Sequence, residues 1–524
     1  MTLATRAALA TCTLLALAGC ASWAPGDFGA GPLPPATQGA LAAAGVPAEA
    51  LAAVALPLGH GGRAWGHRAE VPMQPGSTMK LVTSVVALDR LGPGHRGHTT
   101  LKSTAPLHGE VLHGDLWLEG GADPDLGIAQ FWALLVDLRA AGVRRIAGDL
   151  VVDRRLFSPA RADLGLPPFD DGVEWGYNVV PDALGLAGAL LPIEIDSTSG
   201  AVAARLVPPL AGIEVRSRMA LAERPCDSWE DDWQPPRQVE GGVEGGSAGA
   251  VELHGAFPRD CTRRIALQVV DRQRLTEALF RTLWTGLGGE LAGRVREAAA
   301  DAALDVPLGS PLGSPLGSPL AAQADASTSP LPAPPPPRVL ARRHSRPWGE
   351  VLRGMNKTSD NPRTRLLYLS LGVPHMPAAP GVPTAALAER VVRQWFAERG
   401  IATPGLVLDN GSGLSRSERI APLTLAQMLQ AAWAGRYASD FMMSLPLAGE
   451  DGTMRARLKD SPAAGWARLK TGTLRNVAAL AGYVRDAEGR PWAVAMMINH
   501  ERARAARPAL DALVDALARG PGLK

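Results

Sequence analysis

A proline-rich segment divides the chain and sets the first limit on its fold. Leu-Gly-Ser-Pro occurs three times in succession between Leu308 and Pro319, and ten of the 45 prolines lie between Val306 and Pro337. Because proline donates no backbone hydrogen bond, such a stretch cannot form a hydrogen-bonded ladder or a core. We therefore expect a solvated linker or surface loop over residues 306–338, with folded protein on both sides. A proline-rich ligand for a partner domain is the alternative.

The remainder has the composition of a globular protein. Hydrophobic residues make up 46% and charged residues 20% of the 524 residues, which excludes wholesale disorder and a polytopic membrane protein. Lys and Arg number 53 against 51 Asp and Glu, a net charge of +2. There is no basic field that would favour a nucleic-acid partner.

The N-terminus is typical of an export signal. A single early charge, Arg6, precedes the apolar run Ala7–Ala18, which is too short to cross a bilayer comfortably. The run ends in Leu-Ala-Gly-Cys at Cys20, which resembles the lipobox of bacterial lipoproteins, whose cysteine is lipidated. Residues 1–19 would then be a signal peptide and residues 20–33 a tether. A simple signal peptide cleaved nearby is the alternative, and either way the sequence predicts export.

Two further cysteines would remain in the exported protein, Cys226 and Cys261. Because the compartment is oxidising, we expect them to form a disulfide. In the chain-entropy model, closing that loop stabilises the fold by about 4 kcal/mol. A metal site is the alternative, but two thiols with only His254 between them fall short of four ligands. The sequence predicts no metal ion and no other cofactor.

Three short motifs point to nucleophilic catalysis. Ser77-Thr78-Met79-Lys80 opens a segment to Leu91 with helical apolar spacing, so we expect Ser77 and Lys80 on one helix face. Ser359-Asp360-Asn361 follows the proline-rich segment, and Lys470-Thr471-Gly472-Thr473 comes later. Each motif alone is weak, but the three in this order in an exported chain form a strong combination.

The segments after the third motif predict regular structure. Two apolar runs, residues 477–484 and 492–498, are joined by a turn-rich hexapeptide and predict a β-hairpin. Residues 501–518 follow with Leu510 and Leu517 on one face, which predicts a terminal helix packed on a sheet.

The residue types of the motifs suit acyl transfer. A serine hydroxyl needs a base, and a lysine whose pKa is lowered by burial and a neighbouring cation can serve. This assigns Ser77 as nucleophile, Lys80 as base, and Lys470 as the cation that also attracts a substrate carboxylate. The structural alternative makes Ser77 a helix cap and Lys470 a strand-edge charge.

Other motif residues suit substrate binding. Ser359 is expected to relay a proton to the leaving amine, and Asn361 to bind an acyl-chain amide and Lys80. We expect Thr471, Gly472 and Thr473 to bind substrate along a strand edge, where glycine permits close approach of a backbone. The amides of Ser77 and Thr473 are candidate oxyanion-hole donors.

These motifs resemble those of the class C low-molecular-mass penicillin-binding proteins, the D-alanyl-D-alanine carboxypeptidase/endopeptidase family of serine peptidases. Residues 118–126, 148–153, 409–416 and 445–453 also resemble stretches of that family. The likeness extends from about residue 36 onward.

The resemblance implies an α/β (α+β) fold. It implies a β-lactamase/transpeptidase-like catalytic domain, an antiparallel sheet flanked by helices, interrupted by a large inserted α+β region. The expected boundaries are 34–95 and 339–524 for the catalytic domain and 96–305 for the inserted domains.

The resemblance also implies a carboxylate, carried by the inserted region, that binds the diamino-acid side chain of the substrate. Asp170, Asp171 and Glu174 are the candidates. The chain departs from the family at residues 362–365, Pro-Arg-Thr-Arg, where apolar and acidic residues are more usual. We expect the helix there to persist with a different outer face.

The resemblance implies an enzyme that acylates Ser77 with the penultimate D-Ala carbonyl of a peptidoglycan stem peptide, releases D-Ala and hydrolyses the ester. Cleavage of D-Ala to diamino-acid crosslinks would use the same chemistry, and penicillin and other β-lactams would inhibit it. The expected location is the periplasm, with membrane contact only through an outer-membrane lipid anchor on Cys20. A β-lactamase or esterase on the same scaffold and an inactive peptidoglycan-binding lipoprotein are the alternatives.

Overall fold

The computed structural model describes residues 29–59, 61–239, 249–299, 336–376, 381–521 and 523. The expected signal peptide, the lipidation at Cys20, most of the tether and residues 306–335 of the proline-rich segment lie outside the described residues. Within the described part of the chain, no helix is long and apolar enough to cross a membrane.

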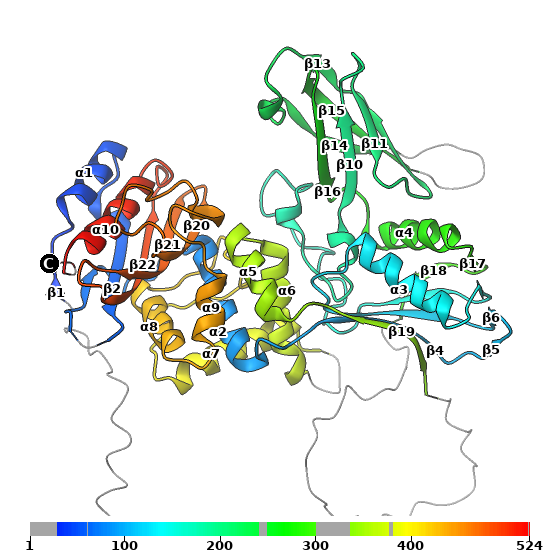
Figure 1. Cartoon of the computed structure of the whole chain (residues 1–524), viewed down its shortest axis with the longest axis horizontal. Coiled ribbons are helices and arrows are strands. Elements are labelled where there is room, and N and C mark those ends of the chain that lie inside the picture. Colours follow the sequence, from blue (N-terminus) through cyan, green and yellow to red (C-terminus); the bar gives the residue numbers. More distant parts are fainter. Residues whose placement is uncertain are drawn as a thin grey trace, which may run out of the picture.

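A six-stranded sheet forms the centre of the first lobe, at the left of Figure 1. Its order is β1-β3-β2-β22-β21-β20, antiparallel except for the β1–β3 pair. The strands are β1 (Gly29–Ala30), β2 (Leu51–Pro57), β3 (Trp65–His67), β20 (Arg468–Leu474), β21 (Val477–Arg485) and β22 (Pro491–Asn499). Leu51 of β2 lies opposite Ile498 of β22, so early and late segments of the chain share one sheet. The pairing of β21 with β22 confirms the predicted hairpin.

Helices cover both faces of this sheet. On one face α1 (Pro35–Ala44) packs with α10 (Arg507–Arg519) in an apolar core. The other face is covered by helices that share a second core. They are α2 (Lys80–Leu91), α5 (Trp348–Thr358), α6 (Asn361–Gly372), α7 (Thr384–Glu398), α8 (Pro422–Trp433) and α9 (Ala438–Ser444). The result is a mixed α/β lobe with an antiparallel sheet, as expected.

Two predicted helices differ in detail from the sequence expectation. The terminal helix begins at Arg507, after turns over residues 501–506, because Pro508 suits only a first helical turn. Its predicted apolar residues, including Leu510 and Leu517, are buried. Helix α2 was expected to bury one face, but all residues from Lys80 to Leu88 are buried. It is therefore a central helix surrounded by other elements.

The second lobe, at the right of Figure 1, contains two sheets that lie beside α3 (Ile128–Ala140) and α4 (Arg272–Gly286). The five-stranded sheet has the order β18-β9-β7-β4-β19 and the smaller one the order β17-β8-β6-β5. Their strands are β4 (His98–Ser103), β5 (Leu107–His108), β6 (Val111–Leu112), β7 (Leu116–Gly121), β8 (Arg145–Ile146), β9 (Leu150–Asp153), β17 (Glu290–Leu291), β18 (Val295–Glu297) and β19 (Arg338–His344).

Two further sheets extend from this lobe, at the top of Figure 1. One has the order β11-β10-β16, and in the other β15 pairs with β12, β13 and β14. Their strands are β10 (Leu191–Asp196), β11 (Ala203–Leu206), β12 (Ile213–Ser217), β13 (Ala220–Ala222), β14 (Trp233–Val239), β15 (Gly249–Pro258) and β16 (Thr262–Leu267). A disulfide joins Cys226 to Cys261 in this region. Most of the second lobe shares one apolar core, whereas Ala122, Phe157 and Ala183 join a core of the first lobe.

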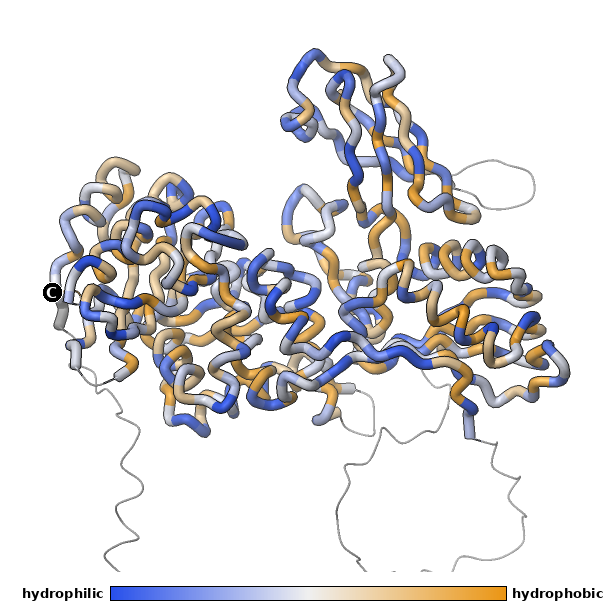
Figure 2. Tube along the Cα trace, viewed as in Figure 1, coloured by the Kyte–Doolittle hydropathy of each residue, from blue (hydrophilic) through white to orange (hydrophobic). Residues whose placement is uncertain are grey.

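The chain enters the second lobe along β4 and returns along β19. The two strands pair antiparallel, with His98 opposite His344. Figure 2 shows β19 as largely hydrophilic, in keeping with the sequence Arg-Val-Leu-Ala-Arg-Arg-His. This pair of strands leads directly to α2 on one side and to α5 on the other, which are elements that carry the candidate site.

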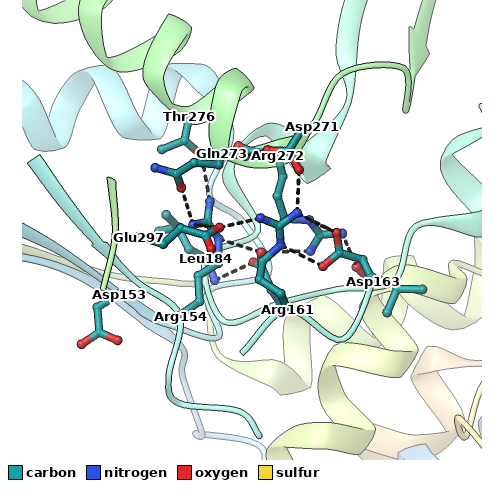
Figure 3. A network of polar contacts seen from close by, with 12 residues as sticks. Asp153, Arg154, Arg161, Asp163, Leu184, Asp271, Arg272, Gln273, Thr276 and Glu297 are labelled. Atoms are coloured by element: carbon teal, nitrogen blue, oxygen red, sulfur yellow. Dashed lines mark hydrogen bonds and ion pairs between the residues drawn. The ribbon is translucent and has the colours of Figure 1, made fainter. Parts of the chain in front are cut away.

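A buried polar network holds the loop after β9 against α4 (Figure 3). Arg154 and Arg272 both donate to Asp182 Oδ2, at 2.8 and 2.9 Å. Arg272 also donates to the carbonyl of Val180, and Asp182 Oδ1 accepts from the amide of Leu184. The network therefore fixes residues 180–184, which continue the segment that faces the first lobe.

Candidate active site

The structure brings Ser77, Lys80 and Asn361 into one hydrogen-bonded group. Ser77 lies in a 3₁₀ turn, Gly76–Met79, that leads into α2, whose first residue is Lys80. Lys80 Nζ lies 2.9 Å from Ser77 Oγ and 2.6 Å from Asn361 Oδ1. The amine is thus within reach of the hydroxyl proton, as a base for Ser77 requires.

The second and third motifs meet through Lys470 and Ser359. Lys470 Nζ donates to Ser359 Oγ and to the carbonyl of Thr471, both at 2.8 Å. Ser359 ends α5 with φ of 62°, and Asn361 begins α6. This left-handed residue turns the chain sharply between the two helices, so the side chains of Ser359 and Asn361 both reach buried lysines.

Burial shapes the charge of the site. The pKa of Lys80 is well below its usual value because the amine is fully buried and because Lys470 adds a repelling charge, while Glu418 acts in the opposite direction. Burial also lowers the pKa of Lys470 to about 7. A lysine in such surroundings can be neutral near neutral pH and can accept a proton.

Glycines allow the Ser77 turn to touch the edge strand β20. A Cβ on Gly472 would lie 2.5 Å from the carbonyl oxygen of Pro75 and 3.1 Å from Ser77 N. Gly76 has φ of 51°, and a Cβ there would lie 3.2 Å from Thr473 N. The amides of Ser77 and Thr473 therefore lie on either side of this close contact, where two donors could face one oxyanion.

The other residues of β20 lie as strand alternation predicts. Lys470 and Gly472 are buried, whereas Thr471 is half-buried and Thr473 is exposed. The Thr471 hydroxyl bonds to that of Thr453, at 2.9 Å. β20 is the last strand in the sheet order; Leu447 pairs with Arg468 at its start, and no named strand pairs with its outer edge beyond that bridge among the described residues.

Sequence reasoning missed a third partner of Lys80. The carbonyl oxygen of Ser412 lies 2.5 Å from Lys80 Nζ, and the carbonyl of Gly411 accepts from Thr83 Oγ1 at 2.7 Å. The signal that could have found this segment was the resemblance of residues 409–416 to the family. Any residue type can supply a backbone carbonyl, so a motif of residue types cannot predict this contact.

The second lobe reaches the site through residues 177–179. Asn361 Nδ2 donates to the carbonyl of Tyr177 at 3.1 Å. The hydroxyl of Tyr177 donates to Asp170 Oδ2 at 2.9 Å. Glu174 instead is 3% exposed and accepts from the indole of Trp233, while Asp171 is exposed. Of the three candidate carboxylates, Asp170 is thus linked to Asn361 through Tyr177.

The departure at residues 362–365 affects both sides of α6. The helix persists, with Pro362 as its second residue, and Arg363 pairs with Asp360 at the surface. Arg365, however, is only 8% exposed and points inward. The helix therefore persists with a different outer face, as predicted, and Arg365 in addition changes its inner face.

A cavity of about 1050 Å³ lies where the two lobes meet beside the second motif. Ser359, Asn361 and Tyr177 line it together with residues 123–128, 185, 187–190 and 192 of the second lobe. No group of three His, Cys, Asp or Glu residues suited to a metal ion occurs among the residues that the structure describes.

Comparison with known proteins identifies relatives of the whole arrangement. The model of the D-Ala-D-Ala carboxypeptidase 3 (S13) family matches residues 39–328 and 326–519. The chain is 29% identical over 436 residues to a D-alanyl-D-alanine carboxypeptidase of Actinomadura sp. (strain R39), covering 79% of this chain and 71% of the relative. It is 26% identical to D-alanyl-D-alanine carboxypeptidase DacB of Haemophilus influenzae, covering 82% and 80%.

A solved structure shows the same fold. The crystal structure of penicillin binding protein 4 (dacB) from Haemophilus influenzae superposes with a TM-score of 0.68 at 23% identity. The match covers 90% of this chain and 96% of the other. The similarity therefore includes both lobes.

Proposed function

Because the chain belongs to the D-Ala-D-Ala carboxypeptidase 3 (S13) family, that of the class C low-molecular-mass penicillin-binding proteins, we propose that Ser77 is the nucleophile with which it removes the terminal D-Ala of peptidoglycan stem peptides. The observation that carries the assignment is the 2.9 Å contact between Lys80 Nζ and Ser77 Oγ. The enzyme is a serine-type carboxypeptidase.

Acylation begins with Lys80 in its neutral form. Ser77 Oγ attacks the penultimate D-Ala carbonyl while Lys80 Nζ takes the hydroxyl proton. The amides of Ser77 and Thr473 stabilise the oxyanion. The proton taken up by Lys80 reaches the leaving amine through Ser359, which is hydrogen-bonded to Lys470, as the peptide bond breaks, so that Lys80 is neutral again. Water then hydrolyses the ester, with Lys80 again the base, and restores Ser77.

Substrate binding uses the edge of β20 and the second lobe. Lys470 attracts the terminal carboxylate, Thr471, Gly472 and Thr473 bind the substrate backbone, and Asn361 binds an acyl-chain amide. We assign Asp170 to the ammonium group of the diamino acid, because its link to Tyr177 lies beside Asn361. A diamino acid as the leaving amine would give endopeptidase activity with the same groups.

Domain organisation and location complete the proposal. Residues 34–95 and 339–524 would form one catalytic domain interrupted by inserted domains over residues 96–305, which is supported by the largely separate apolar cores. The finer location would be the periplasm, with a lipid on Cys20 as the outer-membrane anchor. Radiolabelled palmitate incorporated by the wild type and lost in Cys20→Ala would support the anchor, and equal labelling would contradict it.

The nucleophile assignment is tested with a fluorescent penicillin. The wild type should be labelled covalently, and Ser77→Ala should lose the label because no acyl ester can form. Ser370→Ala, a deletion of the same hydroxyl on α6 away from the site, should label as the wild type does. A labelled Ser77→Ala variant would refute the assignment.

Product analysis separates the proposal from its alternatives. Purified enzyme incubated with peptidoglycan should release D-Ala, and mass spectrometry of muropeptides would give the share of crosslink cleavage. Rapid turnover of a β-lactam without D-Ala release would instead indicate a β-lactamase. Binding to sacculi with no product would indicate an inactive scaffold.

A further inference from the structure

Residues 409–414, which follow α7, provide a backbone carbonyl that contacts Lys80. Three of their amides donate hydrogen bonds to a buried carboxylate, that of Glu418. Glu418 is 0% exposed. Its Oε1 accepts from three consecutive amides, those of Asp409 at 3.3 Å, Asn410 at 3.1 Å and Gly411 at 2.8 Å. Glu418 Oε1 thus fixes the backbone immediately before Ser412. The carbonyl oxygen of Ser412 accepts a hydrogen bond from Lys80 Nζ.

The same segment is held from its other end by Arg365. This side chain, carried by the inward face of α6, donates to the carbonyl of Leu414 at 3.4 Å. It also donates to the carbonyls of Asn178 and Val179, both at 3.3 Å, and so ties the segment to the second lobe. Glu418 and Arg365 therefore bracket Ser412 on both sides along the chain.

Neither group is explained by the core around it. Glu418 Oε2 and Arg365 Nε are buried without a hydrogen-bond partner among the described residues. Burying two charged side chains with incomplete hydrogen bonding is costly, and it is usually retained where the charges serve a site. Both residues bind the backbone of the segment that carries the Ser412 carbonyl, and that carbonyl contacts Lys80.

We propose that Glu418 and Arg365 are positioning residues for the base: together they hold residues 409–414 so that the Ser412 carbonyl meets Lys80 Nζ, and their opposite charges bias the amine in opposite directions. The inference rests on Lys80 being the base of the proposed reaction. It adds two residues that do not touch the substrate and act through Ser412 and through their fields.

The charges around the two groups fix the sign of each effect. Lys80 faces Lys470 from β20, Arg365 from α6, Asp360 from the turn before α6, and Glu418. Among these the cations lower its pKa, whereas Asp360 and Glu418 raise it.

Glu418 itself has a perturbed pKa. Burial and the charge of Asp409 raise it to about 7, although its backbone hydrogen bonds act against the rise. The phenol of Tyr368 also faces this carboxylate. Glu418 is therefore an anion mainly above neutral pH.

The decisive experiment is the pH profile of penicillin acylation, measured as the second-order rate constant from pH 6 to 10. Glu418→Gln keeps an oxygen for the three amides but removes the charge, so the acid limb should move to lower pH. Arg365→Met removes a cation, so the acid limb should move to higher pH. We expect each shift to be up to about one pH unit. Damage to the fold alone would not move the two variants in opposite directions.

A second variant of Glu418 tests the positioning itself. Glu418→Ala removes the acceptor of three amides, and the maximal acylation rate should fall by roughly tenfold to a hundredfold. Glu418→Gln should restore most of that loss. Glu398→Gln, the same change at an exposed carboxylate of α7, should leave both rate and profile unchanged.

Two results would overturn the inference. One is an acid limb that moves in the same direction, or not at all, in Glu418→Gln and Arg365→Met. The other is a maximal acylation rate in Glu418→Ala equal to that of the wild type. The Arg365→Met profile decides alone if the Glu418 variants do not fold, since an acid limb that stays or moves down contradicts the proposal. Failure of the proposed function is a different observation, because the wild type itself would then not be acylated at Ser77.

Discussion

At the scale of residues, the site depends on two buried lysines held close to two serines. The sequence predicted Ser77, Lys80, Ser359, Asn361 and Lys470 as a group, and the structure brings their side chains together. It could not predict Ser412 or Glu418, because one acts through its backbone and the other through three amides. Such contacts depend on the path of a loop and leave no spacing rule to recognise.

The depressed pKa of Lys470 should appear in stability. Its pKa is about 7 in the folded protein against 10.5 ordinarily, so between these values the unfolded chain binds more protons. The free energy of unfolding should therefore rise with pH in this window, by up to about 1.4 kcal/mol per pH unit from this group. Lys470→Met should flatten the rise of the melting temperature between pH 7 and 9. The exposed Lys459→Met should keep the wild-type slope, and equal slopes for Lys470→Met would contradict the assignment.

Gly413 is a second test at this scale. It has φ of 81°, and a Cβ would collide with the carbonyl oxygen of Gly76, beside the proposed nucleophile Ser77. Gly413→Ala should lower the rate of penicillin acylation by about a hundredfold, because the Ser77 turn must move. Gly435→Ala, where a Cβ would come no nearer than 3.3 Å to another atom, is the control. Unchanged acylation of Gly413→Ala would show that the turn has room to adjust.

At the scale of elements, the local spacing of apolar and polar residues predicted one hairpin and one helix correctly. The β21–β22 hairpin was found because two apolar runs flank a polar turn, and α10 because its apolar residues repeat at helical spacing. The start of α10 and the complete burial of α2 could not be predicted, because both depend on neighbours distant in sequence. The strand order of the sheets in the second lobe could likewise not be predicted, since many of their strands are only two to four residues long.

The network of Figure 3 makes a prediction at this scale. Asp182 is buried between Arg154 and Arg272 at 2.8 and 2.9 Å, so removing its carboxylate leaves two buried cations without their shared anion. Asp182→Ala should lower the free energy of unfolding by about 3–5 kcal/mol. Asp227→Ala, which removes a fully exposed partner of Arg263, should have little effect. Thermal unfolding of both variants would decide, and similar melting temperatures would contradict the role of the network.

At the scale of the whole molecule, two lobes with largely separate cores share one site. The proposed catalytic side chains come from the first lobe, while the backbone carbonyl of Tyr177 of the second accepts a hydrogen bond from Asn361. The disulfide lies at the far end of the second lobe, within its core. Stability of the second lobe and chemistry in the first should therefore be separable.

The disulfide provides that separation. Replacing Cys226 and Cys261 together by alanine should destabilise the second lobe by up to about 4 kcal/mol, because the unfolded chain loses a closed loop. Penicillin acylation at Ser77 should remain close to the wild-type rate at 25 °C. Calorimetry with parallel penicillin labelling would test this. If penicillin labelling of this variant is lost at the same temperature as its lowered unfolding transition, the two lobes unfold as one unit.

The central sheet also has a consequence for the order in which the exported chain can fold as it emerges. Strand β2 emerges early, yet its neighbour β22 is among the last segments made, and Lys470 follows Ser77 only after the entire second lobe. The second lobe can fold as soon as β19 is complete, whereas β2 and the apolar helix α2 must wait with unpaired amides and uncovered side chains. Partly emerged chains of this protein are therefore natural clients for chaperones, and competence to bind penicillin appears only when the last strands have emerged and paired.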